Sequence, residues 1–166
     1  MSIYYVPHEE INLEKWDKTI MQAFNGNAYG FSWYLDRVAL KWDALVEDDY
    51  ARIMPLPRRQ RFSVQYIYQP FLARQLGIFS RKSLAQADVD RFLQAIPKTF
   101  RYVDTSLNVF NSASSGDYRC HKQYSYELDL IPPYATLAKN YHKSIKKQLK
   151  TAYQAPLHVF RHVSHE

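Results

Sequence analysis

The stretch Gln69–Ser80, QPFLARQLGIFS, places one glycine, Gly77, just after two side chains that can bind an anion, Arg74 and Gln75. A glycine at this point has two interpretations. It allows a backbone turn or bulge that other residues avoid, or it lets backbone N–H groups approach a phosphate closely. The chain has only four glycines, so the choice between these interpretations bears directly on function.

A second group of candidate residues is a set of lysines near the C-terminal end. We predict a basic amphipathic helix over residues 133–152, after a proline pair, with an apolar side opposite a basic stripe that contains no acidic residue. One interpretation is a solvated face, and the other is a surface that binds RNA or another polyanion through its phosphates. The lysines of this stripe are Lys139, Lys143, Lys146, Lys147 and Lys150.

Three other groups have reactive side chains but weaker patterns. Adjacent Asp48 and Asp49 are typical of a tight hairpin turn. The histidines 158, 162 and 165 have a spacing that suits a metal only on a helix, and we predict a strand there, so we expect no metal site. Cys120 is the single cysteine and is interpreted as an inert thiol. No motif identifies a catalytic residue.

Composition limits the class of protein. With 166 residues, 46% of them hydrophobic and 16% aromatic, the chain can bury a substantial core. The net charge of +6 is compatible with a polyanionic partner. Because the sequence has neither an apolar run of about 18 residues nor a signal-like start, we expect no membrane span and a cytoplasmic protein.

The predicted elements form an α+β fold of one domain over residues 1–166. A strand at Ile3–Val6 precedes a helix capped by Asn12 and a second helix from Ser32. A three-strand meander turns at Asp48-Asp49 and ends near residue 70. The remaining elements are a helix at Ser83–Ile96, a strand at Phe100–Leu107, a strand pair reaching Leu130, the basic helix and a strand at residues 156–163.

This order of elements resembles that of the GNAT acyltransferase fold. Three segments are similar to FemAB-type proteins, which are double-GNAT peptidoglycan aminoacyltransferases and their bacterial relatives: FSWYLDRVALKWDALV, YIYQPFLARQLGIFS and YELDLIPPYATLAKNYHKSIKKQLKTA. The resemblance spans nearly the whole chain. It implies a mixed sheet flanked by helices and identifies the chain as the first lobe of a two-lobed protein.

The resemblance also gives the opening stretch a role. GNAT enzymes bind the pyrophosphate of acyl-CoA on backbone amides after the fourth strand, and here that frame falls on Arg74, Gln75 and Gly77. Its last position, which needs a small residue, is Phe79. The resemblance therefore implies a degraded CoA loop, as in FemAB-type proteins, which take their acyl group from aminoacyl-tRNA. No cofactor is expected, with acetyl-CoA or another acyl-CoA as the alternative.

Substrate contacts implied by the resemblance fall on Trp33, near the peptidoglycan-precursor side, and on Tyr68 and Gln69, where GNAT strands splay. Each also has a plain structural interpretation, Trp33 as a core residue and the other two as the end of a strand. The expected function is related to N-acyl or aminoacyl transfer, without activity in the single lobe. The alternatives are a stand-alone acyl-CoA N-acetyltransferase and a non-catalytic module for RNA or an acidic partner. Self-association through the surface of the missing lobe is a further expectation.

Overall fold

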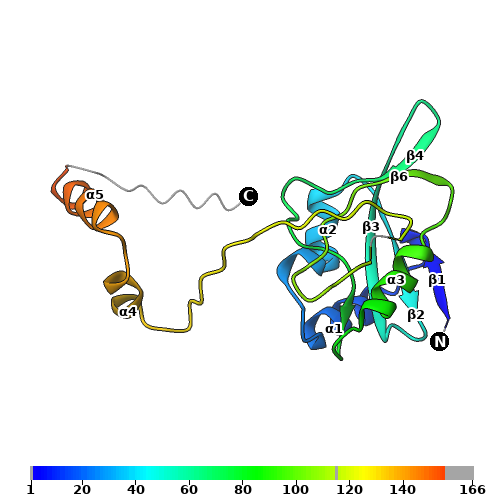
Figure 1. Cartoon of the computed structure of the whole chain (residues 1–166), viewed down its shortest axis with the longest axis horizontal. Helices are drawn as coiled ribbons and strands as arrows, with labels where there is room; N and C mark the ends of the chain where they lie inside the picture. The colour runs from blue at the N-terminus through cyan, green and yellow to red at the C-terminus, as the bar shows by residue number, and fades with distance from the viewer. Residues whose placement is uncertain (1, 115, 156–166) are drawn as a thin grey trace, which may run out of the picture. The chain divides into compact units, whose positions relative to one another are not determined.

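The computed structural model describes residues 2–114 and 116–155. The chain divides into two compact units, Met1–His121 and Lys122–Glu166. The first unit contains a mixed sheet and its covering helices, and the described part of the second contains two helices (Figure 1). The α+β class is therefore confirmed, and each unit is described by itself.

The sheet has six strands in the order β1-β2-β3-β4-β6, with the short β5 pairing with β3. Every neighbouring pair is antiparallel except β4 and β6, which run parallel. The predicted meander is present as β2 to β4, with its first turn at Asp48. The strands are β1 (Ile3–Val6), β2 (Trp42–Glu47), β3 (Arg52–Arg61), β4 (Val64–Ile67), β5 (Phe79–Ser80) and β6 (Phe100–Val103).

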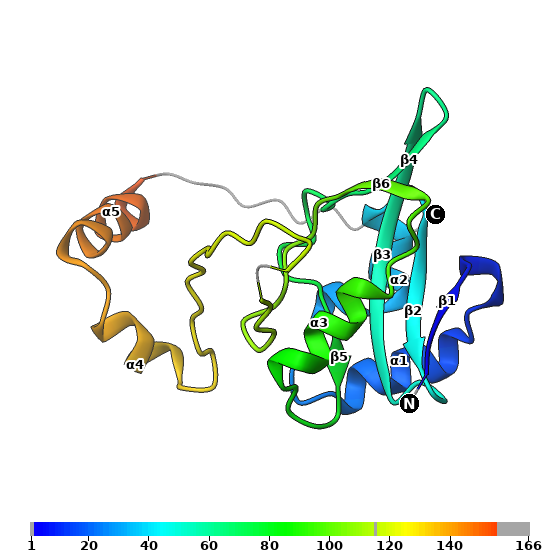
Figure 2. The ribbon, with the colours of Figure 1, turned by 45° about the vertical axis from the view of Figure 1, so that its right-hand side comes forward.

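Helices cover both faces of this sheet (Figure 2). On one face α1 (Leu13–Gln22) and α2 (Ser32–Val38) bury a cluster that includes Trp16, Leu35 and Trp42. On the other face α3 (Gln86–Gln94) packs Val89 and Phe92 against the sheet. The two 3-10 helices are η1 (His8–Glu10) and η2 (Ala28–Gly30). Successive side chains of a strand point to opposite faces of the sheet. Because helices cover both faces, every residue of β2 is buried.

Local signals of the sequence are realised at the first two helices. Asn12 caps α1, because its side chain accepts a hydrogen bond from the N–H of Lys15 at 3.0 Å. The spacing of Trp16 and Ile20 then turns both side chains into the core. Helix α2 begins at Ser32 as predicted.

Two strand predictions differ from the structure, and a third falls outside the described residues. The strand predicted to reach Leu107 ends at Val103, and Leu107 forms only an isolated bridge with Leu76. The strand pair predicted to reach Leu130 is wrong, because residues 118–130 contain no strand. Their alternation of apolar and polar residues has no neighbouring strand to pair with here. The predicted strand at 156–163 lies outside the described residues.

The basic helix predicted for 133–152 is two helices in the second unit, α4 (Tyr134–Lys139) and α5 (Lys143–Gln154). The break has a local cause. The side chain of His142 accepts from the N–H of Ser144 and caps α5, so the backbone of His142 is extended and not helical. The Nζ of Lys146 in turn donates to the carbonyl of Lys139 at 2.7 Å, at the C-terminal end of α4.

Candidate functional site

The most concentrated polar cluster of the first unit surrounds Asp43 on β2, which is fully buried. One carboxylate oxygen accepts a hydrogen bond from the hydroxyl of Tyr5, with an O···O distance of 2.5 Å. The other accepts a hydrogen bond from the backbone N–H of His8, with an N···O distance of 3.0 Å. Arg58 on β3 forms an ion pair with Asp43 through its Nε. Burial and the hydrogen bond to Asp43 raise the pKa of Tyr5, so the phenol stays protonated and continues to donate.

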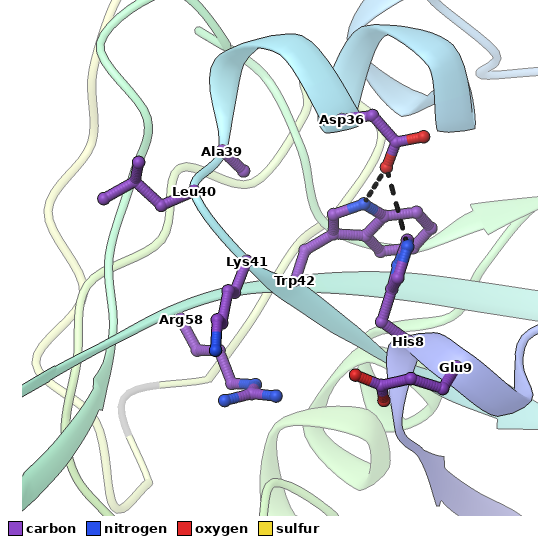
Figure 3. Close-up of a pocket in the computed structure, with 8 residues that line it drawn as sticks. All are labelled: His8, Glu9, Asp36, Ala39, Leu40, Lys41, Trp42 and Arg58. Atoms are coloured by element: carbon purple, nitrogen blue, oxygen red, sulfur yellow. Dashed lines mark hydrogen bonds and ion pairs between the residues drawn. The ribbon is translucent and has the colours of Figure 1, made fainter.

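A cavity of about 240 Å³ opens beside this cluster (Figure 3). Its lining comes from η1, from the end of α2 with the segment after it, and from β2 and β3. Asp36 on α2 accepts from the indole Nε1 of Trp42 at 2.8 Å, which fixes the upper wall in the view of Figure 3. The lining residues are His8, Glu9, Asp36, Ala39, Leu40, Lys41, Trp42 and Arg58.

The cavity has charges of both signs, with Lys41 and Arg58 on one side and Glu9 and Asp36 on the other (Figure 3). Neither the Nη groups of Arg58 nor the Nζ of Lys41 has a side-chain partner among the described residues. Both point into the same part of the cavity in Figure 3. Because Asp43 already holds the Nε of Arg58, the outer edge of the guanidinium is left to bind a carboxylate or phosphate.

His8 lines this cavity from η1. Its Nε2 lies 3.8 Å from Asp36, and its Nδ1 is buried with no hydrogen-bond partner in the described chain. These contacts make His8 part of the polar wall that Asp36 forms with Trp42.

A second buried ionic network lies further along the sheet and is structural. Glu47, almost fully buried, pairs with Arg52 at 3.1 Å and with Arg91 at 2.7 Å. Arg52 also contacts Asp88 at 2.9 Å. These pairs join β2 and β3 to α3, and every charge in the network has a partner.

The segment around Gly77 uses its backbone amides internally. The N–H of Leu76 donates to the carbonyl of Ser106 at 2.9 Å, and the N–H of Ile78 donates to the side-chain oxygen of Asn111 at 2.7 Å. No helix follows directly, because α3 begins at Gln86. Arg74 is exposed, and Gln75 lies beside it with its carbonyl accepting from Asn27 at 3.3 Å.

Gly77 itself has φ +90°, a conformation that glycine adopts readily and other residues rarely do. A Cβ here would also lie 2.3 Å from the side-chain oxygen of Asn111. Phe79 is fully buried in the core on the α1 and α2 face. The backbone of Gly77 thus adopts the conformation expected of a turn or bulge glycine. The neighbouring amides of Leu76 and Ile78 already donate hydrogen bonds within the protein, so neither is available to a phosphate.

The residues suggested as substrate contacts differ in their surroundings. Gln69 accepts from the N–H of Ser106 at 2.8 Å and donates to the carbonyl of Ala73, so it ties together the chain ends that follow β4 and β6. The hydroxyl of Tyr68 accepts from the N–H of Leu40 at 3.2 Å. Trp33 is not a core residue, because it is 58% exposed and makes an edge contact with Tyr34.

The structure brings only some of these residues together. Gln69 and Leu76 both form hydrogen bonds with the backbone of Ser106, and Gly77 is the next residue after Leu76. Trp33 is elsewhere, on α2, where its ring contacts Tyr34. The lysines Lys139, Lys143, Lys146, Lys147 and Lys150 are all exposed, in the second unit. The histidines 158, 162 and 165 lie outside the described residues.

Sequence reasoning missed the Asp43 cluster and the cavity beside it. A sequence signal for Asp43 existed, since Asp43 and Glu47 are the two charged residues of β2, and a buried charge is costly without a partner. Its partners Tyr5, His8 and Arg58 are scattered along the chain, so their convergence required the fold.

No helix within residues 2–114 and 116–155 is long and apolar enough to cross a membrane. The same described ranges hold no group of three or more histidine, cysteine, aspartate or glutamate side chains placed to bind a metal. Comparison of the chain with family models, with curated proteins and with solved structures found no match in any of the three.

Proposed function

We propose that the chain is a GNAT-like domain related to N-acyl or aminoacyl transfer, of the kind found in FemAB-type proteins. The observation that carries the proposal is the sheet. An antiparallel meander ends in β4, which pairs in parallel with β6, and helices occupy the β1–β2 and β5–β6 connections. This is the order of elements on which the resemblance to the GNAT fold rests.

The role that we propose is binding of the transfer partners, with an acyl donor other than acyl-CoA. The amides of Leu76 and Ile78 already have acceptors, and Asp88 places a carboxylate in the first turn of α3, where it accepts from the N–H of Ala85 at 3.1 Å. A pyrophosphate at that helix end would meet negative charge. An aminoacyl ester carried on RNA needs no such amides, and the Arg58 and Lys41 side of the cavity can accept an anionic group of an acceptor.

The proposal is tested by thermal unfolding with two matched ligand pairs. We expect acetyl-CoA to raise the melting temperature no more than ATP at equal ionic strength, because no amide cradle selects it. We expect an aminoacyl-tRNA to stabilise the protein more than its deacylated form. A ligand at about 100 times its dissociation constant adds about 2.7 kcal/mol, or several degrees.

Two outcomes would contradict the proposal. A shift specific to acetyl-CoA would favour a stand-alone acyl-CoA N-acetyltransferase. Equal stabilisation by the aminoacyl-tRNA and its deacylated form would show that the protein binds RNA without recognising the aminoacyl group.

A second candidate function, a binding module for polyanions, is favoured by the lysines of the second unit. Within α4 and α5 the basic residues are exposed and no acidic residue accompanies them. Such a surface binds phosphates through charge and reads no bases.

For this candidate we expect replacement of Lys143, Lys146 and Lys147 by glutamine to weaken binding of a tRNA. The plot of log affinity against log salt concentration should become less steep by about 2 to 3, since each lost phosphate contact reduces the magnitude of its slope by about 0.7 to 0.9. Fluorescence anisotropy over a salt series measures both quantities. The control replaces three exposed lysines of the first unit, Lys18, Lys82 and Lys98. An equal loss in the control would show that net charge, and not this surface, drives binding.

A further inference from the structure

The β3–β4 hairpin continues past the helices that cover the sheet, as both ribbon views show (Figures 1 and 2), and β6 pairs with β4. Register places Arg59 opposite Tyr66 and Tyr66 opposite Tyr102, so the three form one row across three strands. Residues directly opposite each other share a face of a sheet. Arg61 lies on that face as well, because side chains two residues apart along a strand point the same way. Tyr68 follows directly after β4, and the guanidinium of Arg59 lies over its ring.

We call this row and its two neighbours the tyrosine–arginine platform, which consists of Arg59, Arg61, Tyr66, Tyr68 and Tyr102. Tyr102 is 62% exposed on the edge strand, although an aromatic ring on a sheet is usually covered. Tyr66 contacts Tyr68 with ring centroids 6.4 Å apart. The platform therefore presents the exposed ring of Tyr102 beside the half-buried rings of Tyr66 and Tyr68.

The charges of the platform are held ready for an anion. The guanidinium of Arg59 lies 4.2 Å from the ring centre of Tyr68, and that of Arg61 lies 5.2 Å from the ring centre of Phe62. Neither arginine pairs with a carboxylate anywhere in the described parts of the chain. Stacking on a ring orients a guanidinium while its N–H donors stay free.

From this arrangement we infer that the platform binds single-stranded nucleic acid. Unpaired bases stack on Tyr102 and Tyr66, and Arg59 and Arg61 contact the phosphates between them. Exposed aromatic rings on a sheet, interleaved with arginine, are suited to unstacked bases, whereas a duplex keeps its bases inside and offers phosphates alone. An acidic peptide would match the charge but would leave the rings without a stacking partner.

This inference goes beyond the proposed function and does not rest on it, because the probe carries no acyl group. The platform is also distinct from the lysines of α4 and α5, because those lysines lie on helices of the second unit and not on a sheet. Failure of the aminoacyl-tRNA test and failure of this one are therefore separate results.

The test is fluorescence anisotropy with the full chain and an oligouridine RNA of about 12 nucleotides, a length within the site sizes of single-strand binders. Two probes accompany it, an abasic strand of equal charge and an RNA duplex of the same length, which carries more phosphates. We expect the oligouridine to bind tighter than either. Tyr102→Leu keeps an apolar residue on the strand and should weaken oligouridine binding about fivefold or more, with the salt slope unchanged.

Replacing Arg59 and Arg61 by glutamine should weaken oligouridine binding. It should also reduce the magnitude of the slope of log affinity against log salt concentration by about 1.4, which corresponds to two phosphate contacts on a single strand. The matched controls are Phe71→Leu, which removes an exposed ring elsewhere, and the pair Arg74→Gln and Arg81→Gln, which removes the same charge. Circular dichroism confirms that each variant is folded.

Four results would overturn the inference. They are no binding of oligouridine at low salt, equal binding of the abasic strand, equal effects of the platform variants and their controls, and equal binding of an oligoglutamate peptide. The last of these would assign the surface to an acidic protein.

Discussion

Replacing Asp43 by alanine is expected to destabilise the protein by about 3 to 5 kcal/mol, the cost of breaking a buried ion pair from one side. The variant leaves the Nε of Arg58 without its carboxylate, and the hydroxyl of Tyr5 and the N–H of His8 without their acceptor. Chemical unfolding in urea, followed by far-ultraviolet circular dichroism, measures the loss.

The control is Asp49→Ala, which also removes an aspartate from an ion pair. Asp49 lies 2.6 Å from the Nζ of Lys15, but both side chains are largely exposed. An exposed pair contributes about 0 to 1 kcal/mol. A loss at Asp43 no larger than at Asp49 would show that Asp43 does not hold β1, β2 and β3 together.

Replacing Gly77 by alanine is expected to cost about 2 to 4 kcal/mol, since a positive φ alone costs a non-glycine residue about 1 to 3 kcal/mol. The added Cβ would overlap the side-chain oxygen of Asn111 and press against Leu107 at 3.1 Å. Asn111 would have to move, and with it the acceptor of the N–H of Ile78. The midpoint of urea unfolding reports the effect.

Gly116→Ala is the matched control, because a Cβ at Gly116 meets only ordinary contact, 3.7 Å from the hydroxyl of Ser114. This control should leave the midpoint almost unchanged. If Gly77→Ala were as mild as Gly116→Ala while acetyl-CoA binding was lost, the phosphate interpretation of Gly77 would be restored.

Much of the fold was predictable because its signals are local. The cap at Asn12, the start of α2 at Ser32 and the hairpin turn at Asp48 each depend on a few neighbouring residues. The meander followed from alternation and turn residues alone. The GNAT-like assignment remains a proposal, because element order does not by itself fix a fold.

Other features depend on contacts between distant parts of the chain, which a single sequence does not encode locally. The alternation in residues 118–130 predicts strands, but a strand needs a partner edge, and none is described there. The break between α4 and α5 is an exception, because the His142 cap at the break is local but competes with a continuous helical pattern. The partners of Asp43 come from β1, η1 and β3, so only the folded sheet unites them.

The parallel pairing of β4 with β6 also has a consequence for how the chain folds. The turns that join β2, β3 and β4 are short, whereas β6 reaches β4 only after β5 and α3 have been passed. Closing that longer loop costs more entropy and comes later. Until then β4 is an unpaired edge that can capture a strand of another copy, and the exposed charges of Arg59 and Arg61 beside it discourage such aggregation.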